Sequence, residues 1–129
     1  MLDMLKLAAK YALKRNDRPF LLGAVGIRSD GRIVHSKNSA VIDTFEFAVY
    51  KRFPEAHAEA RLTKKLGFGA TVYVARVSRG SGELAMARPC ENCQSILKAF
   101  RVKKVYYTIS KNQWGRWDPE KNIDSYYED

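Results

Sequence analysis

Two short segments, far apart along the chain, together contain three of its four cysteine and histidine residues. The chain has 129 residues, of which two are cysteines and two are histidines. Both cysteines lie in residues 89–93, Pro-Cys-Glu-Asn-Cys, and one histidine lies in residues 57–59, His-Ala-Glu. Thiolate and imidazole are common protein ligands of zinc. The chain is therefore expected to fold so that these two segments meet around a metal ion.

The number of such side chains indicates what kind of site they form. A structural zinc ion is usually held by four protein ligands, whereas a catalytic zinc ion keeps one position open. After His57, Cys90 and Cys93, the remaining imidazole or thiol donor is His35. Unless His35 or a carboxylate completes the shell, the site is open, which is typical of a catalytic centre.

A Cys-x-x-Cys pair at the start of a crossover helix also has a second interpretation, as a redox-active dithiol. The local pattern around Cys90 and Cys93 fits both. The His-x-Glu segment upstream and the proline directly before Cys90 favour the metal site over the redox pair.

Composition and length predict one globular domain over residues 1–129, with 46% hydrophobic residues and 29% charged residues. No apolar run approaches the ~20 residues that span a bilayer. Lysines interrupt the first fourteen residues, so we expect no signal peptide and a cytoplasmic protein without a membrane partner. Lys and Arg outnumber Asp and Glu by 23 to 14, and the resulting charge of +9 favours anionic partners. The sequence is compatible with a homo-oligomer.

Hydrophobic periodicity and turn residues predict an alternation of helices and strands. We expect helices over residues 2–14, 54–66 and 89–100, and strands over residues 20–28, 32–36, 70–77 and 102–109. The first two strands are expected to form a hairpin, and the last two a parallel pair joined by a helical crossover. Gly23 and Gly26, inside the first strand, suggest either the close approach of another group or simple packing against a helix. Residues 110–129 are not assigned to an element; they either cover the sheet or cap a substrate pocket.

His-x-Glu followed by Pro-Cys-x-x-Cys is the signature of zinc nucleobase deaminases. From about residue 20 to 109, the chain resembles the cytidine and deoxycytidylate deaminase superfamily. This resemblance implies an α/β fold in three layers, with a mixed β-sheet covered by helices on both faces. It also implies that zinc is held between two helix starts.

Carried over residue by residue, the resemblance implies that His57, Cys90 and Cys93 bind Zn²⁺ and that Glu59 is the catalytic proton shuttle. It further implies substrate contacts from Asn38 and Ala58, although Asn38 also fits an ordinary turn. Histidine in the first ligand position and the two-residue gap between the cysteines look more like the deoxycytidylate, guanine and tRNA-adenosine branch.

Two departures concern the regions that select substrate. Residues 78–88 form a long connection before the Pro-Cys pair, where most members of this superfamily have almost none. In addition, no clear strand is expected after residue 109.

Three functions remain open from the sequence. The first is hydrolytic deamination of a cytosine base in a nucleoside or nucleotide. The second is deamination of a base in nucleic acid, with single-stranded substrate bound by phosphate contacts and aromatic stacking. Its candidate residues are Arg79, Arg88, Arg101, Lys103 and Lys104 for phosphates, and Trp114, Trp117 or an aromatic residue of 45–53 for bases. The third is a non-catalytic binding module stabilised by zinc.

Overall fold

The computed structural model describes residues 1–13, 20–37, 62–63, 65–78 and 80–129. Residues 62–63 and 65–66 are helical. The remaining elements are α1 (Asp3–Ala12), β1 (Phe20–Ile27), β2 (Ile33–Lys37), β3 (Thr71–Ser78), β4 (Leu84–Ala85), α3 (Glu91–Ala99), β5 (Lys104–Thr108), β6 (Gln113–Asp118) and β7 (Ile123–Glu128). In this described part of the chain, no helix is long and apolar enough to cross a membrane.

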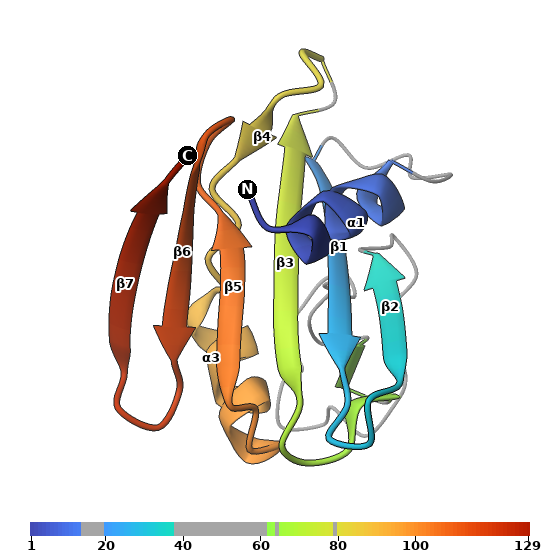
Figure 1. Cartoon of the computed structure of the whole chain (residues 1–129), viewed down its shortest axis with the longest axis vertical. Coiled ribbons are helices and arrows are strands. Elements are labelled where there is room, and N and C mark those ends of the chain that lie inside the picture. Colours follow the sequence, from blue (N-terminus) through green and yellow to red (C-terminus); the bar gives the residue numbers. More distant parts are fainter. Residues whose placement is uncertain (14–19, 38–61, 64, 79) are drawn as a thin grey trace.

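The strands form one mixed sheet in the order β2-β1-β3-β5-β6-β7, with the short β4 beside β3 (Figure 1). β1 runs antiparallel to both β2 and β3, which confirms the expected hairpin. β3 and β5 are parallel, with Thr71 opposite Lys104 and Val74 opposite Tyr107. Because α3 connects these two strands, the predicted helical crossover is confirmed as well.

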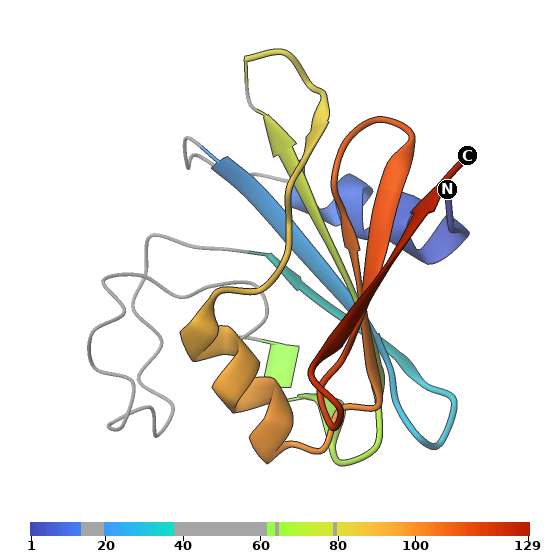
Figure 2. The same ribbon diagram turned by 90° about the vertical axis from the view of Figure 1, so that its left-hand side faces the viewer.

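Helices cover both faces of the sheet, as the sequence predicted. Figure 2 shows α1 on one side, and α3 together with the helical residues near 62–66 on the other. On the α1 side, Ala8 packs with Val25 and Ala75. On the α3 side, Leu62 and Leu97 belong to one larger core cluster. We call these two surfaces of the sheet the α1 face and the α3 face.

Helix α1 approaches β1 so closely that only glycine fits between them. A Cβ atom added to Gly23 would lie 2.0 Å from the carbonyl oxygen of Ala8 and 2.7 Å from the amide nitrogen of Ala12. Gly26 points to the other face, where an added Cβ would lie 2.3 Å from Cδ2 of Leu66. The close approach that the two glycines suggested is therefore packing against helical residues on opposite faces.

The expectation that no strand follows residue 109 is wrong, since β6 and β7 extend the sheet by a second hairpin. The apolar signal was weak because only one face of this hairpin is strongly buried and many of its residues are polar. Gly115 and Trp117 are buried, whereas the residues between and around them are half-buried or exposed. The long connection over residues 78–88 also contains an unpredicted element, β4, which pairs with Arg76 and Val77 of β3.

The contact of α1 with Gly23 gives a first prediction. Gly23→Ala should lower the free energy of unfolding by about 1–3 kcal/mol, because α1 must shift to accommodate the added methyl group. Gly80→Ala is the matched control, since an added Cβ there meets nothing within 4 Å. Urea denaturation of both variants measures the difference. Equal stability of the two variants would show that α1 is not held against β1 as described.

Candidate metal centre

Both cysteines lie at the start of α3. Cys90 is the N-cap residue, with extended backbone angles (φ −66°, ψ 165°), and Cys93 lies in the first turn. The thiol-bearing side chain of Cys93 is fully buried, whereas Cys90 is exposed. Both residues lie in the described part of the chain and are thiols, with no disulfide between them. Two sulfur donors one helical turn apart can face one soft cation, so this part of the site fits zinc.

The helix begins at this point for local reasons. Pro89 has no backbone N–H and cannot donate to a preceding turn, so a helix does not extend backwards through it. The first helical hydrogen bond runs from the amide of Gln94 to the carbonyl of Cys90, at 2.8 Å. The Gln94 side chain donates to the carbonyl of Pro89, also at 2.8 Å. Glu91 places an acidic side chain in the first turn, where the helix dipole favours it.

The segment that leads into the helix is held by Thr108, the last residue of β5. The hydroxyl of Thr108 donates to the carbonyl of Ala85 at 2.7 Å and accepts from the amide of Arg76 at 3.1 Å. The backbone carbonyl of Thr108 accepts from the amide of Ala87 at 2.8 Å. Because Thr108 is fully buried, these bonds are shielded from water. They attach the approach to Cys90 to the carboxyl end of β5.

A second attachment comes from the C-terminal hairpin. Arg88 donates to both carboxylate oxygens of Asp124 on β7, from Nε at 2.7 Å and from a terminal guanidinium nitrogen at 3.0 Å. The hydroxyl of Tyr107 donates to the same carboxylate at 2.5 Å. The hydrogen bond from Arg88 lowers the pKa of the Asp124 carboxyl group. Burial, followed by the bond to Asp124, raises the pKa of Tyr107. The described structure therefore favours an ionised Asp124 and a neutral Tyr107 near neutral pH.

Four of the site residues predicted from the sequence, His57, Ala58, Glu59 and Asn38, lie outside the described residues, and their roles stay predictions. The chain is described again just after the first three of them, at Leu62. Leu62 shares a core cluster with Leu97 of α3. The described residues that follow the His-Ala-Glu segment therefore lie on the same face of the sheet as the two cysteines.

The described residues that follow the His-Ala-Glu segment are also attached to the β1–β2 hairpin, through Lys65. A terminal nitrogen of Arg28 donates to the carbonyl of Lys65 at 2.7 Å, and Nζ of Lys65 donates to the carbonyl of His35 at 2.6 Å. These bonds fix the helical residues 65–66 relative to the sheet.

His35, the remaining imidazole of the chain, lies on the α1 face. It is opposite Val25 in the β1–β2 register, and its ring stacks on Tyr11 of α1 with a centroid distance of 3.8 Å. Helix α3, which begins at the cysteines, lies on the other side of the sheet from α1 (Figure 2). His35 is therefore not placed to share a metal ion with Cys90 and Cys93. Among the residues that the structure describes, no group of three or more His, Cys, Asp or Glu side chains could hold a metal ion.

The residues considered for nucleic-acid binding do not form one surface. Arg88 is ion-paired with Asp124, and Lys104 with Asp118 at 2.7 Å. Trp117 is fully buried, with its indole N–H bonded to Asn122 at 3.0 Å, so it cannot stack on a base. Trp114 is half-buried and stacks on Tyr127 at 4.2 Å between centroids. Arg79 and residues 45–53 lie outside the described residues.

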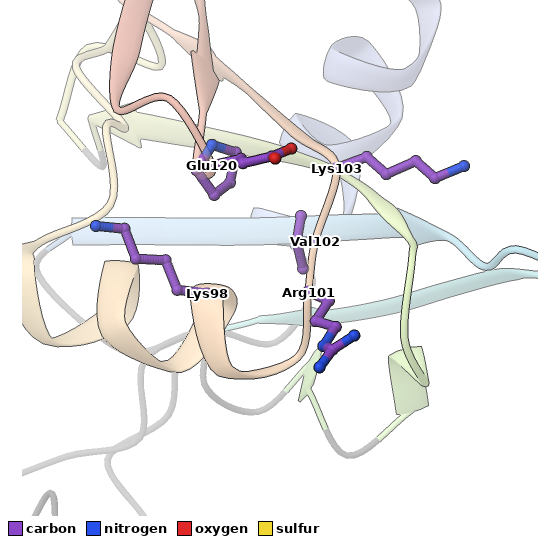
Figure 3. Close-up of a pocket in the computed structure, with 6 residues that line it drawn as sticks. Lys98, Arg101, Val102, Lys103 and Glu120 are labelled. Carbon is purple, nitrogen blue, oxygen red and sulfur yellow. The ribbon is translucent and has the colours of Figure 1, made fainter.

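Arg101 and Lys103 line a hollow of about 500 Å³ at the far end of α3, together with Lys98 and Glu120. Three cationic side chains around one hollow suggest an anion site, but Figure 3 shows their charged ends pointing in different directions. In this view Lys98 points up and to the left from α3, Lys103 points to the right, and Arg101 points downward. These cations do not converge on a single phosphate group.

Sequence reasoning missed Thr108, Tyr107 and Asp124 as residues that support the site. Nothing adjacent to them in the sequence marks them, because their partners lie 23, 17 and 36 positions away, respectively. Arg88 was noted, but as a phosphate ligand; its position directly before the Pro-Cys pair was the signal that could have indicated a supporting role.

Comparison with known proteins supports the resemblance seen in the sequence. Residues 1–109 match the family model described as the cytidine and deoxycytidylate deaminase zinc-binding region. The structure is similar to cytidine deaminase from Burkholderia pseudomallei, with a TM-score of 0.62 and 18% identity over 95% of this chain and 97% of that one. It is also similar to cytidine deaminase from Mycobacterium tuberculosis (TM-score 0.53, 19% identity, 85% and 91% covered). The cytidine deaminase from Mycobacterium leprae gives a TM-score of 0.53 with 21% identity, covering 79% of this chain and 82% of that one. No curated protein matches the chain.

The similarity to these structures confirms the predicted fold. At sequence identities of 18% to 21%, it establishes the architecture and nothing more. The family match covers both candidate ligand segments, 57–59 and 89–93.

The role of Thr108 gives a second prediction. Thr108→Val keeps the shape of the side chain but removes the hydroxyl that bonds to the carbonyl of half-buried Ala85 and to the amide of half-buried Arg76. The free energy of unfolding should fall by about 1–3 kcal/mol. Thr108→Ser keeps the hydroxyl and serves as the matched control. If thermal or urea denaturation finds the valine variant as stable as the serine variant, the hydroxyl does not hold the approach to α3.

Proposed function

Because the chain belongs to the cytidine and deoxycytidylate deaminase family, we propose that it is a zinc-dependent hydrolase that deaminates a cytosine base. The observation that carries this proposal is the family match over residues 1–109, together with two thiols at one helix start. In the reaction, water adds to C4 of the base and the C4–N bond breaks. The products are a uracil base and ammonia.

We propose that His57, Cys90 and Cys93 hold the zinc ion. When bound, zinc acts as a Lewis acid and lowers the pKa of a coordinated water to roughly 7. The chain supplies two sulfur donors from a single turn of α3, and Thr108 and Asp124 hold the segment that precedes them. Three protein ligands leave one position open, which distinguishes a catalytic centre from a structural one.

We assign the proton transfers to Glu59. Its carboxylate takes a proton from the attacking water and delivers it to the ring nitrogen N3. It then takes the second proton from the hydroxyl group newly added at C4 and delivers that proton to the leaving amine. Glu59 lies two residues after His57, which places it near the proposed metal ligand in sequence without making it a ligand. Asn38 and Ala58 stay candidate contacts to the substrate.

The proposed substrate is a nucleoside or nucleotide. The net charge of +9 supports an anionic substrate, because a positive protein attracts it over long distance. A base within nucleic acid is the second candidate, favoured by the exposed Lys98, Arg101 and Lys103. It is the weaker of the two, because Arg88 and Lys104 are ion-paired and Trp117 is buried.

The test is ammonia release by the zinc-loaded protein on a panel of substrates. The panel contains cytosine, cytidine, deoxycytidine, their monophosphates, adenosine, guanine and single-stranded oligonucleotides. Turnover of one cytosine nucleoside or nucleotide supports the proposal. Activity confined to an oligonucleotide, with binding that weakens steeply as salt rises, would replace it with the second candidate. Zinc binding with no turnover of any panel member would favour a non-catalytic module.

Glu59→Gln gives the third prediction. The amide keeps the size of the side chain but cannot accept and return a proton, so kcat should fall at least ~100-fold. Bound zinc, measured by metal analysis, should stay the same because Glu59 is not a proposed ligand. Glu128→Gln, which changes an exposed acid of β7, is the control and should keep full activity. Retained activity in Glu59→Gln would refute the shuttle role.

The cysteines give the fourth prediction. Cys90→Ala should weaken zinc binding more than the ~100-fold reached by changes in the second shell of a metal site. Thermal stability of the zinc-loaded protein should fall with it, because bound metal stabilises the folded state. Ser95→Ala, at an exposed position of the same helix, controls for effects on α3. If Cys90→Ala binds zinc as tightly as Ser95→Ala does, Cys90 is not a ligand.

A further inference from the structure

The β6–β7 hairpin lies beyond the part of the chain that matches the family, residues 1–109, yet it reaches the residue before the Pro-Cys pair. We infer that Asp124 and Tyr107 are positioning residues for the metal centre, acting through Arg88 to set how Cys90 enters α3. This inference rests on the proposed role of Cys90 as a zinc ligand.

The ion pair between Arg88 and Asp124 has the geometry of an orienting contact. Its two hydrogen bonds, of 2.7 and 3.0 Å, join one planar guanidinium group to both oxygens of one carboxylate. A two-point contact fixes the direction of the arginine side chain as well as its distance. The carboxylate side of the pair is well shielded, with 12% of the Asp124 side chain exposed against 35% for Arg88. The guanidinium group also lies 5.9 Å from the ring centroid of buried Trp117.

Asp124 is itself held in place by Tyr107. The buried Tyr107 extends from β5 across β6 and donates its hydroxyl hydrogen to Asp124 at 2.5 Å. Gly115 of β6 makes this path available, because an added Cβ there would lie 2.4 Å from Cζ and 2.6 Å from the hydroxyl oxygen of Tyr107. The carboxylate that binds Arg88 is therefore fixed by three neighbouring strands of the sheet.

Cys90 depends on such anchors more than Cys93 does. Cys93 lies within α3 and is packed in the protein interior. Cys90 is the residue at which the chain changes from extended to helical, so its orientation follows the backbone of the residues before it. Thr108 holds that backbone at Ala85 and Ala87, and Arg88 is the next side chain along. Loss of the ion pair between Arg88 and Asp124 would therefore make the position of Cys90 less fixed relative to Cys93.

The test measures zinc affinity by competition with a chelator, using the full chain. Asp124→Asn keeps the shape of the side chain and removes its charge, and it should weaken zinc binding about tenfold. Arg88→Gln should have a similar effect, and the double variant should be no worse than either single variant, because both remove the same contact. The thiolate-to-metal absorption of the cobalt(II)-loaded protein should also change in Asp124→Asn, since it reports on the geometry of the sulfur ligands.

Lys104→Met is the matched control. It breaks a different ion pair of this hairpin, Lys104 to Asp118 at 2.7 Å, without touching Arg88. Both variants are expected to lower thermal stability, but only Asp124→Asn should alter zinc affinity and the cobalt spectrum. Equal effects of the two variants on zinc, or no effect of Asp124→Asn, would overturn the inference.

Tyr107→Phe provides a second measurement if Asp124→Asn fails to fold. It removes only the hydroxyl that orients Asp124, and zinc binding should weaken in the same direction, by a few-fold; unchanged affinity would overturn the inference. These outcomes are separate from the proposed function, because they concern binding and not turnover. A protein that deaminates no panel member but loses zinc in Asp124→Asn would refute the function and keep the inference.

Discussion

The crossover from β3 through α3 to β5 determines where the described functional groups lie. Parallel strands require the chain to return along one face of the sheet before the second strand begins. The residues between β4 and α3 make part of this return without regular secondary structure, and the cysteine pair comes where that stretch ends and the helix begins. Such a segment cannot satisfy its own backbone groups as a helix does. Thr108 supplies those partners from the end of β5.

The alternation of side chains along each strand then decides which residues can join the site. Neighbouring residues of a strand point to opposite faces. His35 pairs with Val25 and so belongs to the α1 face, away from the cysteines. Trp117 and Asp124 are paired across β6 and β7 and face α3, whereas Trp114 faces the other way. Residues close together in the sequence thus take unrelated roles.

The parts of the fold that were predicted are those with a strong local signal. The β1–β2 hairpin has a Ser-Asp-Gly turn between apolar strands, and the crossover has two apolar strands flanking an amphipathic helix. The start of α3 at the cysteines was marked by Pro89. For Gly23 the sequence left open either the close approach of another group or packing against a helix, and the structure shows packing against α1.

The parts that were missed depend on contacts across the sheet. The side of β6 and β7 away from α3 is mostly half-buried and mixes polar with aromatic residues, and their buried side includes Gly115, which adds no apolar signal. The pairing of Arg88 with Asp124 joins residues 36 positions apart and belongs to no motif. A sequence motif is made of residues close together along the chain, so it cannot predict such a pair. The roles of His57, Glu59, Asn38 and Ala58 stay predictions, because those residues lie outside the described part.

Several of the cationic side chains that give the chain its charge of +9 are already bound to other groups of the protein. Arg88 and Lys104 neutralise carboxylates, and Arg28 and Lys65 bond to backbone carbonyls. These side chains are committed to the fold, so the charge of +9 overstates how many cations can bind phosphate. The exposed cations at the end of α3 point apart, as Figure 3 shows. Their effect is therefore a long-range attraction for anions, which acts on a free nucleotide without requiring a groove for nucleic acid.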